Sequence, residues 1–126
     1  MHIVISNTIE APIYLQIVNQ IKAAVLSGEL REGEGLPSIR GLAAALKISV
    51  ITTKRAYEEL EKEGFIFSRA GKGSYVAAVS KGFAEQSRQK EVLEHLQEAV
   101  RLAKLMGVKK EEVQALLTSC YQEEER

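Results

Sequence analysis

The N-terminal third of the chain has apolar residues at a helical spacing. They stand at every fourth position, at Ile13, Ile17, Ile21 and Val25. This is the spacing of one face of an amphipathic helix. Pro12 fits the start of such a helix, where its missing N–H costs nothing, and Gly28 fits its end. We therefore expect a helix after an extended segment over residues 1–10, followed by a loop over residues 29–35 that is rich in Gly and Glu.

Two shorter helical patterns follow, separated by a tight break. Residues 39–46 carry apolar side chains at spacings of three, one and three, and Ser38 is a favoured N-cap before them. Ser49 is the N-cap expected for the next helix. Aromatic and β-branched residues at 65–69 and 74–79 flank a Gly-rich turn. This arrangement predicts a two-stranded hairpin.

The last third returns to helical spacing. Apolar stripes within residues 83–106 and 113–120 predict two helices, interrupted at Gly107. Two helices of this length cannot enclose both stripes by themselves, so we expect a second copy of the chain to cover them in a helical bundle. The residues expected in this dimer interface are Val92, Leu96, Val100, Ala103, Val113, Leu116 and Leu117.

Composition limits the classes of protein that remain. The chain has 126 residues, of which 45% are hydrophobic, as in soluble globular proteins. This length allows a small domain plus an appendage and leaves little room for a separate ligand-binding domain. No apolar run approaches the ~20 residues of a membrane-spanning helix, and the N-terminus lacks a secretory signal pattern. The single cysteine, Cys120, excludes an intrachain disulfide, favours a cytoplasmic location, and is expected to be buried and inert.

Charge is unevenly distributed along the chain. The 17 basic and 17 acidic residues cancel, which at first argues against a nucleic-acid partner. Residues 35–79, however, carry seven basic and four acidic residues, a net charge of +3, whereas residues 1–34 and 80–126 are net acidic. The four acids lie toward the C-terminal half of the third predicted helix. A cationic face is therefore expected from Arg40, Lys54, Arg55, Arg69 and Lys72.

The order of these elements predicts the fold. A helix, a short helix, a tight turn, another helix and a hairpin form a winged helix-turn-helix, an α+β fold that is mainly helical here. In this fold the N-terminal turn of the third helix enters the major groove of DNA, where base edges carry a distinct hydrogen-bonding code. We expect this domain over residues 1–79 and a two-helix dimerisation element over residues 80–126.

Several segments, in this order and spacing, resemble GntR-type bacterial transcriptional regulators. They are Pro12-Ile13-Tyr14, residues 27–30, residues 36–40, residues 55–64 and residues 71–76. The match covers about residues 11–79, and the short helical tail is similar to the YtrA subfamily. The resemblance implies a regulator, expected to be a repressor, that binds a palindromic operator in double-stranded DNA as a homodimer.

The resemblance also implies roles for individual residues. It places Arg40 at the start of the short helix expected over residues 39–46, which braces against the duplex. It places Ser49, Thr52 and Arg55 in the helix that follows, the recognition helix. Gly71 and Lys72 lie at the tip of the predicted hairpin, the wing. With their neighbours, the expected DNA-binding residues are Ser38, Arg40, Ser49, Val50, Ile51, Thr52, Lys54, Arg55, Arg69, Gly71 and Lys72.

The sequence departs from the family pattern at four positions. Gly41 replaces an acidic residue, and Thr53 stands where an apolar core residue is common. Val50 and Ile51 stand where Pro, Asn or another polar residue is usual. These two side chains are either buried or in contact with thymine methyl groups, and the sequence does not decide between the alternatives.

Catalytic functions find little support in the sequence. His2 and His95 have no Cys or His at a metal-ligand spacing, and no nucleophile and base are paired. We therefore expect no catalytic residue, metal or cofactor, and no membrane partner. The main alternative is a winged-helix module that binds proteins without reading DNA sequence. The sequence leaves open whether a small-molecule effector binds.

Overall fold

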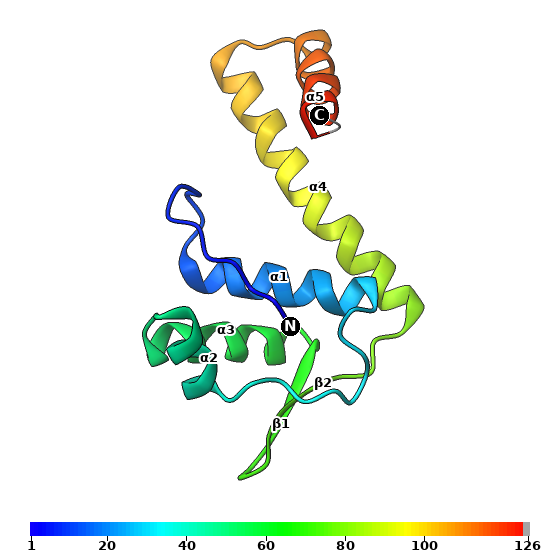
Figure 1. Ribbon diagram of the computed structural model, residues 1–126. Coiled ribbons are helices and arrows are strands. Elements are labelled where there is room, and N and C mark those ends of the chain that lie inside the picture. The colour runs from blue at the N-terminus through cyan, green and yellow to red at the C-terminus, as the bar shows by residue number, and fades with distance from the viewer. Residues whose placement is uncertain (125–126) are drawn as a thin grey trace. The chain divides into compact units, whose positions relative to one another are not determined.

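The computed structural model describes residues 1–124, which form five helices and a two-stranded sheet (Figure 1). It divides into two compact units, residues 1–84 and the residues from 85 onward. The elements are α1 (Ile13–Ser27), α2 (Ile39–Leu46), α3 (Val50–Lys62), β1 (Ile66–Arg69), β2 (Gly73–Val76), α4 (Lys81–Met106) and α5 (Lys110–Glu124). This order confirms the predicted winged helix-turn-helix followed by two helices.

The core of the first unit lies between α1, α3 and the sheet. Ile17 and Ile21 of α1 are completely buried, as their helical spacing predicted, and so is Leu60 of α3. Lys22 of α1 forms an ion pair with Glu63, just beyond α3, with Nζ 2.7 Å from Oε1. The apolar contacts and this largely buried ion pair hold α3 at a fixed position against α1.

Local capping signals determine where the helices begin and end. Ser38 Oγ accepts a hydrogen bond from the Gly41 N–H, and Ser49 Oγ accepts one from the Thr52 N–H, both at 3.0 Å. These bonds confirm both predicted N-caps. Because a Cβ on Gly41 would lie 2.9 Å from Ser38 Oγ, the glycine leaves room for the first cap. Gly28 ends α1 with a φ of 85°, as expected for its position.

The sheet has an additional edge that the sequence did not reveal. β1 and β2 pair antiparallel, and the hairpin extends away from α1–α3 (Figure 1). Residues 33–36 bond to the other side of β2, although residues 33–35 were predicted to belong to a loop. The Gly33 N–H donates to the Val76 carbonyl and the Leu36 N–H to the Ser74 carbonyl, at 2.8 and 2.9 Å. This pairing anchors the base of the wing to the chain before α2.

Two glutamine side chains hold the N-terminal segment along α1. Gln20 both donates to and accepts from the backbone of Val4, at 2.7 and 2.9 Å. Gln16, one turn earlier, makes the same pair of bonds with Ser6, at 3.0 and 2.9 Å. Residues 4 and 6 therefore pair with a helix through side-chain amides, as a strand would pair with its neighbour.

The second unit consists of α5 and α4 after its first turn, separated at Gly107, which has a φ of 76°. Within the described part of this unit no side chain is buried, and the buried residues that the structure describes all lie between positions 16 and 76. Arg101 binds Glu98 on the exposed surface of α4 and thereby lowers the pKa of that carboxyl group. No helix among residues 1–124 is long and apolar enough to cross a membrane.

Candidate nucleic-acid interface

A hydrogen bond from a side chain of α3 holds α2 in position against α3. The Tyr57 hydroxyl donates a hydrogen bond of 2.7 Å to the Pro37 carbonyl, just before α2. Thr53, which stands where an apolar residue is usual, is fully buried, and its hydroxyl donates to the Ser49 carbonyl at 3.1 Å. Because both polar side chains are satisfied internally, the helix-turn-helix can bury them without an unpaired hydroxyl.

The buried Tyr57 gives this arrangement a measurable pH dependence. Burial raises the pKa of Tyr57 to about 12, from an ordinary value of about 10. We expect its contribution to stability to be complete below pH ~10 and to be lost as the pH rises to about 12, because the unfolded chain ionises first. Titration of tyrosinate absorbance should show one of the four tyrosines ionising last, and Tyr57→Phe should remove that step. Four tyrosines ionising together near pH ~10 in the folded protein would contradict the assignment.

The first turn of α3 exposes apolar and hydroxyl groups together. Ile51 is 81% exposed and Val50 is 40% exposed. This excludes the alternative that these two side chains are buried. Beside them, the Ser49 hydroxyl donates to Thr52 Oγ1 at 2.7 Å, which uses the single donor of Ser49 and leaves the Thr52 proton available.

Arg55 is oriented by the start of α1. Its guanidinium carbon lies 3.8 Å from the centre of the Tyr14 ring, in cation–π contact. Within residues 1–124 its side chain has no hydrogen bond or ion pair, so its N–H donors face solvent. Arg55 and Tyr14 share a surface hollow of about 340 Å³ with the start of α3, lined by Pro12, Ile13, Tyr14, Ile51, Thr52 and Arg55.

The wing has an internally braced tip. Phe67 of β1 stacks on Tyr75 of β2 with ring centres 5.7 Å apart, and Arg69 lies over Phe67. The Tyr75 hydroxyl donates a 2.7 Å hydrogen bond to the Lys72 carbonyl. These contacts hold the two cations of the wing, Arg69 and Lys72, at exposed positions where they could bind phosphates.

All the predicted DNA-binding residues lie in the first unit, on α2, α3, the wing and their caps. Thr52 is half-buried, and the others are exposed. Lys54 Nζ lies 3.9 Å from Glu58 Oε1, and this exposed ion pair restricts the lysine side chain little. Sequence reasoning missed Tyr14, which orients Arg55, and Tyr75, which braces the wing, because both act through contacts across the fold. That the predicted DNA-binding residues contact DNA stays a prediction.

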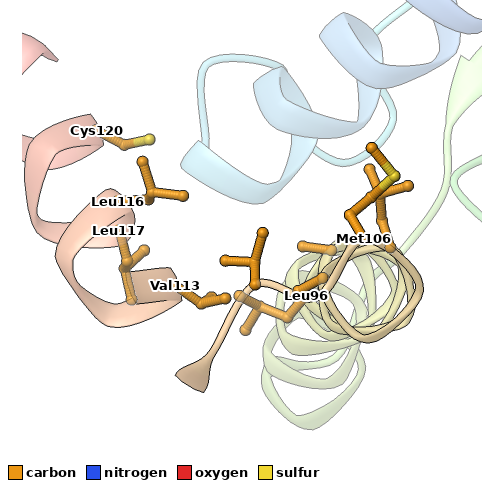
Figure 2. A pocket seen from close by; sticks show the side chains of 10 residues that line it. Leu96, Met106, Val113, Leu116, Leu117 and Cys120 are labelled. Atoms are coloured by element: carbon orange, nitrogen blue, oxygen red, sulfur yellow. The ribbon is translucent and has the colours of Figure 1, made fainter. Parts of the chain in front are cut away.

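The two helices of the second unit enclose an apolar groove of about 460 Å³. Figure 2 shows Leu96 and Met106 of α4 and Val113, Leu116 and Leu117 of α5 lining it. Of the other predicted dimer residues, Ala103 also lines the groove and Val92 lines a neighbouring hollow. Val100 lines neither but is 44% exposed. In the single chain, these side chains form an open apolar surface rather than a core.

The expectation that Cys120 is buried is wrong. The thiol is exposed in the single chain and lines the apolar groove (Figure 2). The sequence pattern correctly placed Cys120 on the apolar stripe of α5, but no second layer of the same chain covers that stripe. Within residues 1–124, no three His, Cys, Asp or Glu side chains gather where they could hold a metal ion.

The fold, with its exposed cationic helix start and wing, is that of a DNA-binding transcriptional regulator of the winged helix-turn-helix class. The chain belongs to the gntR family of bacterial regulatory proteins, whose sequence profile matches residues 13–76.

Individual relatives resemble this chain over most of its length. The HTH-type transcriptional repressor YtrA of Bacillus subtilis is 34% identical over 102 residues, covering 81% of this chain and 78% of YtrA. The uncharacterized HTH-type transcriptional regulator YhcF, also of Bacillus subtilis, is 35% identical over 102 residues, covering 81% of this chain and 84% of YhcF. A solved structure described as a transcriptional antiterminator from Listeria monocytogenes EGD-e is 32% identical, with a TM-score of 0.74 and coverages of 98% and 92%. The predicted YtrA-like character is confirmed.

Proposed function

We propose that this regulator is a repressor that binds a two-fold symmetric operator in double-stranded DNA as a homodimer. The observation that carries the proposal is that the second unit has a continuous apolar groove and no buried side chain within residues 85–123. The similarity to the repressor YtrA supports the direction of regulation.

A second copy of the chain is the occupant that best fits the groove. The groove is lined by ten residues, all of them apolar or cysteine, from both helices and from Val108 between them. Two helices that fully bury no side chain have little to hold them together, whereas four helices from two chains can bury both stripes. A bundle of identical helices is also self-complementary, as a two-fold interface requires. Dimerisation would then bury Cys120 as well.

Dimerisation and DNA reading support each other. Two recognition helices related by a two-fold axis can read half-sites about one helical turn, ~34 Å, apart. In each copy the first turn of α3 would enter the major groove, and Arg69 and Lys72 of the wing would bind backbone phosphates. The neutral overall charge limits non-specific attraction, so we expect tight binding to depend on base contacts.

The proposal makes no use of a cofactor, a metal or a catalytic group. A regulator of this kind acts on the chromosome, so we propose that the protein works in the cytoplasm. Whether a small molecule modulates it lies outside the proposal.

The proposal is tested by recovering the bound DNA. Genomic fragments captured by the full chain would be sequenced and the recovered duplexes titrated in gel shifts at increasing salt. We expect a symmetric site upstream of a small set of genes and an affinity that falls steeply with salt, because phosphate contacts release counterions. If no DNA is enriched, or if the chain instead forms salt-insensitive complexes with proteins, the alternative of a protein-binding module is favoured.

A further inference from the structure

The first turn of the recognition helix exposes an apolar side chain that the fold does not use. Among the large hydrophobic residues described in the first unit, Ile51 has the greatest exposure, at 81%. Apart from its neighbour Val50, the others that are exposed belong to the N-terminal segment, at Met1, Val4 and Ile9. A β-branched residue in this position neither favours the helix nor contributes to the core, so folding does not explain it.

The polar groups around Ile51 have few hydrogen-bonding atoms left for a base edge. The Ser49 hydroxyl donates to Thr52 Oγ1 and caps the Thr52 N–H, so it has no proton left for a base edge. Thr52 keeps one hydroxyl proton, and Arg55 offers only donors. Within the first turn, the Thr52 hydroxyl is therefore the polar side chain that keeps a proton for a base edge, since the Thr53 hydroxyl donates to the Ser49 carbonyl. Ile51 adds the apolar contact that the turn can offer.

We propose that Ile51 contacts the 5-methyl group of a thymine in the major groove, so that each operator half-site contains a thymine recognised by its methyl group. This inference rests on the proposed reading of DNA by the start of α3. The thymine methyl is the apolar group that a base pair presents in the major groove, and cytosine lacks it. Ile51, Thr52 and Arg55 line the same hollow, so a nucleotide placed there would meet an apolar surface, a hydroxyl and a cation together.

The test removes the methyl from the DNA while the protein stays unchanged. Duplexes selected from random sequence by the full chain would be resynthesised with deoxyuridine in place of one thymine at a time. At one thymine per half-site we expect about a fourfold loss of affinity, and roughly fifteenfold when both half-sites are changed, as for one buried methyl group each. Replacing that thymine with cytosine and then with 5-methylcytosine should separate the methyl contribution from the change in pairing.

The protein variants establish which side chain makes the contact. Ile51→Ala should bind thymine and deoxyuridine duplexes equally, whereas Val50→Ala, at the less exposed neighbour, should keep the wild-type preference. Because Ile51 is exposed, its replacement should leave the thermal melt unchanged. If deoxyuridine is neutral at every thymine, or if Ile51→Ala keeps the preference, the methyl contact is wrong while DNA binding stands. If selection enriches no duplex at all, the proposed function fails and the methyl contact fails with it.

Discussion

Replacing Leu116 and Leu117 with glutamate is expected to convert the protein into a monomer and to abolish tight operator binding. Both side chains line the apolar groove, and both are about half exposed in the single chain. An unpaired charge in a buried interface costs on the order of 3–5 kcal/mol. This raises the dimer dissociation constant by at least about a hundredfold. Sedimentation equilibrium at micromolar concentration should then give the mass of one chain, whereas the wild type gives that of two.

A matched variant separates the loss of the groove from the addition of charge. Thr118→Glu adds one of these two charges to α5, at an exposed residue that does not line the groove, and it should remain dimeric. The first unit has its own core, so the late tyrosine ionisation of Tyr57 should persist in the monomer. A dimeric L116E/L117E variant, or a wild-type protein that is monomeric at micromolar concentration, would show that the groove is not the interface.

Arg55→Ala is expected to weaken operator binding by about 1–3 kcal/mol per half-site and to relax selectivity at one base position in each half-site. The guanidinium carbon lies 3.8 Å from the centre of the Tyr14 ring and the side chain has no acidic partner within residues 1–124, so the ring positions Arg55 before DNA arrives. Tyr14→Leu should reproduce part of this loss, since it removes the ring but keeps an apolar side chain at the position. Competition titrations against operators with single base changes measure both effects.

Lys72→Ala is the comparison that distinguishes base reading from phosphate binding. Lys72 lies at the tip of the wing, so its loss should weaken operator and unrelated DNA alike and reduce the salt slope by about one unit per chain, or about two for the dimer. Arg55→Ala should instead change the ratio of operator to unrelated binding. If both variants bind the operator as the wild type does, the assignment of the interface to α3 and the wing is wrong.

The local features of this fold could be predicted from sequence because neighbouring residues determine them. Ser38 and Ser49 cap helices through bonds to backbone groups three residues away, and Gly28 and Gly107 end helices through their own backbone conformation. The pairing of residues 33–36 with β2 could not be predicted, because it joins segments distant in the chain that carry no strand pattern of their own.

The candidate site was predictable in composition but not in geometry. The basic residues of the helix-turn-helix and wing could be read from the sequence, whereas the stacking of Arg55 on Tyr14 depends on how α1 lies against α3. Hydrophobicity alone could not decide whether Ile51 was buried, since an apolar residue can lie either in a core or on a surface that contacts DNA. The prediction that Cys120 is buried was wrong for a related reason, because an apolar stripe need not be covered by its own chain.

Hydroxyl-radical footprinting of the recovered operator with the full wild-type chain tests the central claim most directly. The claim is that two copies of the chain read two symmetric half-sites with their recognition helices. The account predicts two equivalent protected segments on one face of the duplex, with centres about 10 base pairs apart or a multiple of that spacing. A single asymmetric footprint, or uniform protection along the duplex, would contradict it.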